Sequence, residues 1–226
     1  MGTGYNPKIV TDGLIVSIDA RDRKSYSGSG STWKDRSGSG NNGELFNSPT
    51  VTSNFGGGIS FEETDEFMAL GDKAATNYVT VEVWYTRDSE GTGENIVFNK
   101  ENCWEINDNN GNISWAVMAN NKGWFWYDST ANIDIGETVQ FVLRYDGDSV
   151  QSYKNGTLVQ NYSYPSGGVL TNQTNAYPKL NSRHSTRTTI QNAGNHTFYQ
   201  FRVYDRALTA NEISQNFNAQ KDRFGL

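Results

Sequence analysis

Apolar and polar residues alternate with a period of two along much of the chain, and this period is typical of half-buried β-strands. The clearest example is the segment 78–86, where Val79, Val81 and Val83 occupy alternate positions. Similar patterns predict strands at residues 13–20, within 59–71, and at 103–108, 112–118, 122–129, 138–145, 148–154, 157–162 and 198–204. The chain is therefore expected to be an all-β protein built from many short strands.

Turn sequences separate these predicted strands. Asn110–Gly111 and Asn155–Gly156 each fall between two strand patterns, and Asp146–Gly147 marks a third turn. Both central residues of a type I′ hairpin turn need positive φ, which Asn and Gly tolerate. The sequence therefore predicts tight hairpins at the two Asn-Gly pairs and a turn at Asp146–Gly147.

A long Gly/Ser/Asn-rich loop runs from Ser27 to Leu45. It could pass for a linker between two domains, but Trp33 and Leu45 would then lie beside water with no core of their own. We therefore interpret the loop as a surface excursion of a single domain, anchored by Trp33.

One stretch, 204–219, has the pattern of a helix. Thr209 and Glu212 form a capping box, and Leu208 and Ile213 occupy the positions of a hydrophobic staple. Ile213 and Phe217 form an apolar stripe on one face. We expect a short helix that packs one face against the rest of the protein.

Composition narrows the class of protein. The net charge of −6 over 226 residues argues against a nucleic-acid partner, because a phosphate-binding surface needs clustered Lys and Arg. The nearest approach to a basic patch in the sequence is Arg183, His184 and Arg187. Cys103 is the only cysteine, so it has no internal disulfide partner and is expected to be buried. No apolar run is long enough to predict membrane insertion or a secretory signal.

Five landmarks in order resemble a known family. They are "GLIVSIDARDRKSYSGSGSTWKDRSGSGNNGEL", "GGGISFEETDEFMAL", "VTVEVWYT", "SYKNGTLV" and "FRVYDRALTANEISQNFNAQKDRFG". Together they resemble laminin-G-like, concanavalin-A-like jelly-roll domains, in particular those of structural proteins of tailed bacteriophages, including phages that infect cyanobacteria. The resemblance implies an antiparallel two-sheet jelly-roll sandwich with one short C-terminal helix beside it. It also implies an N-terminal arm, 1–7, followed by one domain, 8–226.

The same architecture occurs in glucan hydrolases, so catalysis has to be considered. The resemblance implies that two acidic residues would come from one strand, as Glu-x-Asp-x-Glu or Glu-x-Asp-x-x-Glu. The Glu-x-Asp of this chain is Glu63-Thr64-Asp65, and the second Glu would fall at Phe67 or Met68. His184 and His196 are the only histidines, so a Ser/His/Asp triad has few candidate bases. We expect no catalytic residues.

Calcium is the metal that deserves a test, because relatives of this kind bind Ca²⁺ at the sandwich rim through oxygen ligands. The segment 107–112, "NDNNGN", looks like a calcium loop, but its spacing places Ile106 and Val117 at ligand positions. The resemblance also implies an acidic pair just before the "VRVY" type of segment, where this chain has Tyr199 and Gln200. We therefore expect segment 107–112 to be a hairpin. We expect the protein to bind no metal or cofactor, with Ca²⁺ as the alternative.

Carbohydrate binding remains a hypothesis after these exclusions. In 122–129 both faces of the predicted strand are aromatic, so one face can join the core and the other must be covered or used. Sugars bind to exposed aromatic rings flanked by amides and carboxylates. The candidate ligand-binding residues are Trp124, Trp126, Asn120 and Asn121.

These observations lead to one expected function and two alternatives. We expect a non-enzymatic virion structural protein that assembles in the host cytoplasm and serves in capsid decoration, a head fibre, a tail or a baseplate. Its expected partners are other virion proteins and, for adhesion, host-surface polysaccharide, with a homo-oligomer as a further expectation. The first alternative is a carbohydrate-binding module of a larger secreted or cell-surface protein. The last is a glycan hydrolase.

Overall fold

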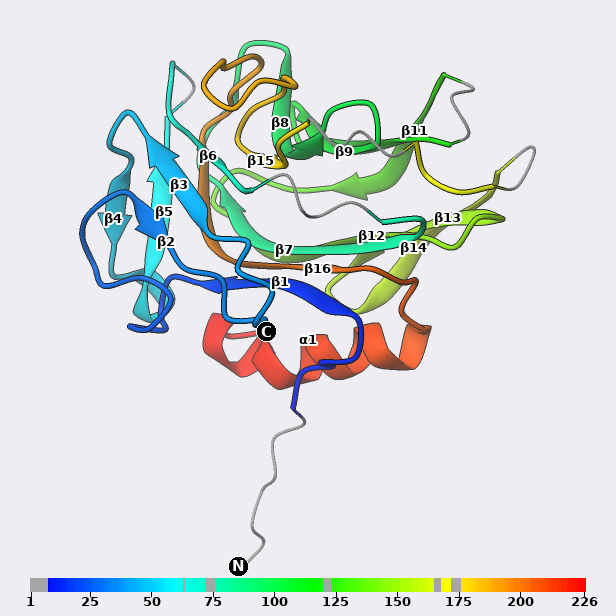
Figure 1. The fold of residues 1–226 in the computed structure, drawn as a ribbon, viewed down its shortest axis with the longest axis horizontal. Coiled ribbons are helices and arrows are strands. Elements are labelled where there is room, and N and C mark those ends of the chain that lie inside the picture. Colours follow the sequence, from blue (N-terminus) through cyan, green and yellow to red (C-terminus); the bar gives the residue numbers. More distant parts are fainter. Residues whose placement is uncertain (1–7, 63, 72–75, 120–122, 165–167, 172–175) are drawn as a thin grey trace, which may run out of the picture.

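A computed structural model describes residues 8–62, 64–71, 76–119, 123–164, 168–171 and 176–226. Two antiparallel sheets pack face to face, and one helix lies on the outside of one sheet (Figure 1). The fold is the jelly-roll sandwich with a C-terminal helix that the sequence predicts. No helix in the described ranges is long and apolar enough to cross a membrane.

The first sheet, sheet A, carries the helix. Its strand order is β14 (Thr157–Ser163), β13 (Ser149–Lys154), β12 (Thr138–Tyr145), β7 (Val79–Arg87), β16 (His196–Tyr204), β5 (Gly58–Phe61) and β4 (Thr50–Thr52). Strand β1 (Leu14–Asp19) also pairs with β16. A short 3-10 helix, η1 (Asn54–Gly56), lies between β4 and β5 in the chain.

The second sheet, sheet B, has an edge strand that is rich in aromatic residues. Its order is β11 (Trp124–Asn132), β10 (Asn112–Met118), β9 (Trp104–Asn109), β8 (Glu94–Lys100), β15 (Lys179–Leu180), β6 (Phe67–Ala69), β3 (Gly43–Phe46) and β2 (Thr32–Trp33). Strands β11 and β2 are therefore the two opposite edges of this sheet.

The hairpins form where the Asn-Gly pairs predict them. Asn110 and Gly111 have positive φ of 54° and 87° and join β9 to β10. Asn155 and Gly156, with φ of 52° and 73°, join β13 to β14. Segment 107–112 is thus a hairpin, as expected from its sequence.

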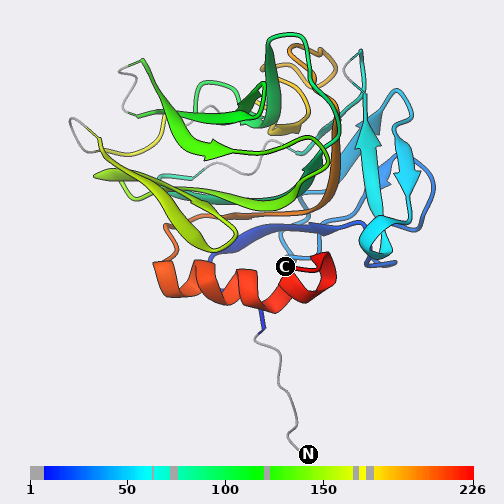
Figure 2. The ribbon, with the colours of Figure 1, turned by 180° about the vertical axis from the view of Figure 1, so that it is seen from behind.

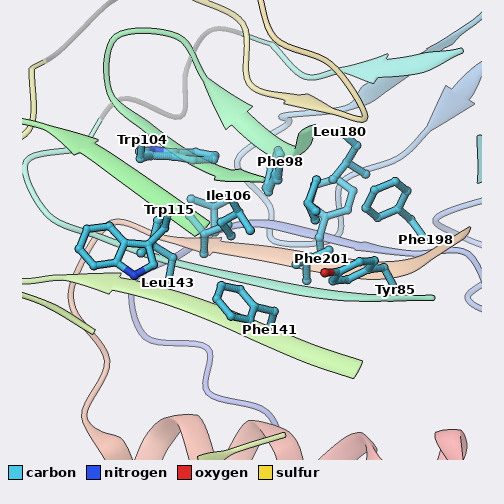
Figure 3. Packing of buried hydrophobic residues seen from close by; sticks show 14 of the residues in the cluster. Tyr85, Phe98, Trp104, Ile106, Trp115, Phe141, Leu143, Leu180, Phe198 and Phe201 are labelled. Atoms are coloured by element: carbon cyan, nitrogen blue, oxygen red, sulfur yellow. The ribbon is translucent and has the colours of Figure 1, made fainter. Parts of the chain in front are cut away.

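The core lies between the sheets and is rich in aromatic residues (Figure 3). Sheet B contributes rings such as Phe98 and Trp115, and sheet A contributes rings such as Phe141 and Phe201. Trp33 is fully buried and meets Phe201 edge-on at 5.8 Å between ring centroids. The predicted anchoring of the loop 27–45 by Trp33 is therefore confirmed.

The helix α1 (Ala210–Phe224) covers the outer face of sheet A (Figure 2). Its capping box is present, with Glu212 N–H donating to Thr209 Oγ1 and the Glu212 carboxylate accepting from Thr209 N–H. The helix ends at Phe224, beyond the 204–219 stretch that shows the pattern. Phe224 stacks on Trp84 at 4.3 Å, and Gly225 at φ 72° ends the helix in the left-handed conformation.

A buried polar network joins α1 to sheet A. Glu82 Oε1 accepts from Arg202 Nη1 at 2.7 Å, and Glu82 Oε2 accepts from Asn216 Nδ2 of the helix at 2.8 Å. All three residues are buried. The outer face of sheet A is thus closed by α1, which leaves the outer face of sheet B as the sheet surface to consider for binding.

Candidate functional site

The edge strand β11 divides its aromatic residues between two faces. Phe125 packs against the core and lies 4.7 Å from Tyr164, and Tyr127 lies 3.7 Å from Tyr162, both between ring centroids. Trp124 and Trp126 take the alternate positions and belong to the outer face of sheet B. The aromatic residues of β11 are therefore divided between a core face and an outer face, as the sequence pattern predicts.

The two outer tryptophans form one continuous aromatic surface. Their ring centroids are 5.6 Å apart with an angle of 37° between the planes. Trp126 is 41% exposed, and Trp124 is partly buried. By contrast, Trp104 and Trp115 are buried in the core. Only Trp124 and Trp126 of these four rings are therefore placed to meet a ligand.

Arg183 lies against this surface from a loop on the outer side of sheet B. Its guanidinium carbon is 5.5 Å from the centroid of the Trp126 ring, a cation–π distance. Arg183 Nε donates to Glu105 Oε2 at 2.9 Å, and Nη2 donates to Glu105 Oε1 and to Glu94 Oε1. Two carboxylates therefore fix the guanidinium beside the tryptophan ring.

Glu105 is the buried anchor of this arrangement. Its Oε2 also accepts from Asn99 Nδ2 at 2.6 Å, and its Oε1 lies 3.5 Å from Asn107 Nδ2. Burial raises the pKa of Glu105, while the Arg183 guanidinium opposes that rise. Both oxygens of this carboxylate are thus engaged inside the protein.

Glu94 and Asp128 form the polar margin of the aromatic surface. Glu94 accepts from Asn107 Nδ2 at 2.8 Å and from Asn192 Nδ2 at 2.8 Å, and 35% of its side chain is exposed. Asp128 is exposed and follows Trp126 on the same face of β11. We call the set Trp124, Trp126, Asp128, Arg183 and Glu94 the Trp126 surface.

The structure does not describe all of the residues that the sequence analysis named. Asn120 and Asn121, named as ligand-binding candidates, lie outside the described residues, as does Glu63 of the Glu-x-Asp sequence. The sequence segment 183–187 does not form a free basic patch, because Arg183 is paired with Glu94 and Glu105, and Arg187 with Glu44.

Of the two histidines, His196 lies in the interior of the protein beside polar partners. His196 is buried, with Nδ1 2.9 Å from Asn181 Oδ1 and Nε2 3.6 Å from Asp108 Oδ2, so both ring nitrogens face acceptors. Over the described part of the chain, no group of three His, Cys, Asp or Glu side chains gathers as a metal site requires.

The family follows from a comparison with family models. The model described as the concanavalin A-like lectin/glucanases superfamily, of the Laminin_G_3 type, matches residues 56–214, which is more than half of the chain. This chain belongs to that superfamily. A comparison with curated proteins gives no match.

Several solved structures that are similar to this superfamily member are binding domains of toxins. The binding domain of Paraclostridial Mosquitocidal Protein 1 is 15% identical with a TM-score of 0.70, and the match covers 92% of this chain and 52% of that one. The botulinum neurotoxin serotype D binding domain is 13% identical with a TM-score of 0.69, covering 93% and 53%. The same toxin's ligand-binding domain in complex with N-acetylneuraminic acid is 12% identical with a TM-score of 0.70, covering 93% and 52%. The likeness shows the fold, and this chain spans about half the length of those structures.

Sequence reasoning about this superfamily member missed the charged part of the Trp126 surface. Arg183 stands 78 positions from Glu105 and 89 from Glu94 in the chain. A signal was present in the strand pattern, because Glu105 and Asn107 alternate with the buried apolar residues Trp104 and Ile106. A buried carboxylate needs a cationic partner, but the pattern does not say which cation supplies it.

Proposed function

We propose that this chain is a non-enzymatic, lectin-like domain that binds a glycan on the Trp126 surface. The observation that carries the proposal is the pair of outer rings, Trp124 and Trp126, held beside Arg183 at the free edge of sheet B. An exposed aromatic pair in a fixed position is a stacking surface for the apolar face of a sugar ring. Glu94 and Asp128 then supply acceptors for sugar hydroxyl groups.

The geometry of the two rings favours an oligosaccharide over a single sugar. The rings are neighbours on one strand and form a surface longer than one aromatic side chain. A glycan that lies along β11 would contact both rings in succession. We therefore propose a ligand of at least two sugar units.

The burial and hydrogen bonding of the carboxylates near the Trp126 surface support a binding role without catalysis. A retaining glycosidase needs two carboxyl groups about 5 Å apart, one of which attacks the sugar while the other transfers a proton. Glu105 is fully buried and both of its oxygens accept hydrogen bonds, so it can neither reach a sugar carbon nor exchange a proton with an open site. Glu94 forms an ion pair with the same arginine, Arg183, and is the more exposed of the two carboxylates.

The comparisons support the proposal through the fold. The three similar structures described above are binding domains, and one of them is a complex with N-acetylneuraminic acid. Because those chains are about twice as long as this one, the support concerns the architecture and leaves the identity of the sugar open to experiment.

We further propose that the domain works on a bacteriophage virion, as part of the capsid decoration, a head fibre, a tail or a baseplate. The order of the five landmarks in the sequence supports this role. Many copies on one particle would raise the avidity for host-surface polysaccharide even if each copy binds weakly. Other virion proteins, and further copies of this chain, would then be its protein partners.

A carbohydrate-binding module of a larger secreted or cell-surface protein is the second candidate. The observation that favours it is the length of the similar toxin domains, in which a unit of this size forms about half of the structure. Mass spectrometry of phage particles purified from the source distinguishes the two. Detection of this chain among the particle proteins supports the virion role, and its absence from intact particles favours the module.

A glycan panel tests the binding proposal directly. The purified protein is applied with Ca²⁺ and again with EDTA, and the same wells are assayed for newly released reducing ends. We expect binding to at least one glycan without release of reducing ends. Release of reducing ends would contradict the non-enzymatic proposal, and binding lost in EDTA would show that Ca²⁺ takes part.

A further inference from the structure

The loop that leads into β2 lies at the opposite edge of sheet B (Figure 1). A second candidate site is lined by residues of this loop. It is a hollow of about 170 Å³, and no carboxylate is among the residues that line it. Three cations line it in a chain whose net charge is −6. The lining residues are Arg23, Lys24, Ser25, Ser27, Ser29, Gly30, Ser31, Thr32 and Lys34.

The three cations are not neutralised by neighbouring acids. Among the described residues, Arg23, Lys24 and Lys34 form no ion pair. The nearby Asp22 carboxylate is instead directed to Arg36, at 3.4 Å. The hollow therefore keeps a positive charge that an anion would compensate.

Arg23 is held in place at the wall of the hollow. Its Nη1 donates to the carbonyl oxygen of Ser27 at 2.9 Å, and it passes directly over Gly28. A Cβ atom at residue 28 would come within 2.5 Å of Arg23 Nη1, and Gly28 has a φ of 99°. Glycine at this position thus allows the guanidinium to lie against the loop.

The loop itself is closed by paired hydrogen bonds that bring Lys24 and Lys34 to the same hollow. Lys34 N–H donates to the carbonyl of Ser25 at 2.7 Å, and Ser25 Oγ donates back to the carbonyl of Lys34 at 2.6 Å. Tyr26 is buried, and its hydroxyl donates to the carbonyl of Gly30 at 3.0 Å. These bonds fix the loop before any ligand arrives, which lowers the entropy cost of binding.

The loop that lines the hollow also has backbone N–H groups that are available to donate. None of the N–H groups from Ser27 to Gly30 donates to another group of the described chain. Gly28 and Gly30 both have positive φ, of 99° and 84°. Successive N–H groups in turns of this kind form concave sites for anions, and oxyanions are bound most strongly by charged donors.

We propose that this hollow binds a single tetrahedral oxyanion, a sulfate or phosphate group, either free or as the ester on a larger ligand. Its volume suits one such group together with a few water molecules and excludes a polyanion from full entry. The site stands at the edge β2, whereas the Trp126 surface stands at the edge β11, so the two sites are independent.

Amide chemical shifts of the ¹⁵N-labelled protein test this site. Sodium sulfate and sodium phosphate are titrated at constant ionic strength against sodium chloride, because screening alone changes the shifts of charged surfaces. We expect saturable shifts that centre on residues 27–32 for at least one oxyanion. Glucose 6-sulfate and glucose 6-phosphate, each compared with glucose, then show whether the ester or the free anion is preferred.

The matched variants are Lys24→Gln with Lys34→Gln, and Lys8→Gln as the control. The side chains of Lys24 and Lys34 make no hydrogen bond with another described residue, so the double variant is expected to fold normally. Loss of two charged donors should weaken binding about tenfold or more, since one charge-assisted hydrogen bond is worth about a factor of ten. Absence of saturation, or equal affinity in the double variant and the wild type, would overturn the proposal.

Discussion

The guanidinium carbon of Arg183 lies 5.5 Å from the centre of the Trp126 ring, and the same guanidinium is bonded to the buried carboxylate of Glu105. One side chain thus connects an exposed aromatic ring to a charge inside the sheet. The position of Trp126 is therefore set by a fixed neighbour, and a fixed ring loses less entropy on binding than a mobile one.

Replacement of Trp126 by alanine should change stability little. The ring is 41% exposed and its main contacts are Trp124 and Arg183, so a loss below about 1 kcal/mol is expected. Trp115→Ala is the contrasting variant, because Trp115 is fully buried and its loss should cost about 3–5 kcal/mol. Thermal and urea melts of both proteins measure the difference. An equally large loss in Trp126→Ala would show that this ring is structural.

Replacement of Arg183 by methionine should be strongly destabilising. It leaves Glu105 as a buried charge without its cation, a change that costs about 3–5 kcal/mol in known buried pairs. Adding Glu105→Gln to Arg183→Met removes that charge, so the double variant should recover much of the stability. Urea unfolding of both proteins measures the recovery, and a double variant no more stable than Arg183→Met would contradict the buried-pair explanation.

The carboxylate of Glu212, at the start of α1, should make stability depend on pH below about pH 4.5. The hydrogen bonds from Arg206, and after them those from Thr209, lower the pKa of Glu212 to about 2 from its ordinary 4.5. A carboxyl whose pKa is lower in the folded state stabilises the protein above its unfolded pKa, and that contribution is lost as the pH falls from 4.5 to about 2.

Glu212→Gln provides the measurement for this effect. The difference in unfolding free energy between wild type and Glu212→Gln should be largest near neutral pH and should shrink as the pH falls toward 2. A difference that stays constant over this range would show that the carboxylate charge contributes nothing to the helix cap.

Phe224 should be as important for stability as an ordinary core residue, although it is the third residue from the end of the sequence. It is buried and stacks on Trp84 at 4.3 Å, so Phe224→Ala should cost about 3–5 kcal/mol. Leu226→Ala, at an exposed position nearby, is the control and should leave the melting temperature unchanged. Equal melting temperatures for the two variants would contradict the docking of α1 through Phe224.

Local signals in the sequence predicted the parts of the fold that depend on neighbouring residues. Asn110–Gly111 and Asn155–Gly156 fixed two hairpins through their own backbone preferences, and Thr209 with Glu212 fixed the start of α1. The end of α1 was not predictable from its pattern, because the contact that extends it is with Trp84, far away in the chain.

The candidate site also has one part that the local sequence predicts and another that depends on contacts between distant residues. Alternation along β11 was sufficient to predict that Trp124 and Trp126 share a face. The pairing of Arg183 with Glu105 depends on how a loop crosses the sheet, and residues 78 positions apart carry no local sign of it. The hollow between Arg23 and Lys34 was missed for the same reason, since the closing bonds of the loop bring its cations together.

Titration calorimetry with the strongest glycan of the panel tests the central claim most directly. Wild type is compared with Trp126→Ala and with Tyr78→Ala, a similarly exposed aromatic residue just before β7 of the other sheet. We predict that Trp126→Ala weakens binding about 30-fold, the effect of an aromatic residue worth about 2 kcal/mol, while Tyr78→Ala binds like the wild type. Unchanged affinity in a folded Trp126→Ala protein would show that the glycan binds elsewhere and would contradict the account.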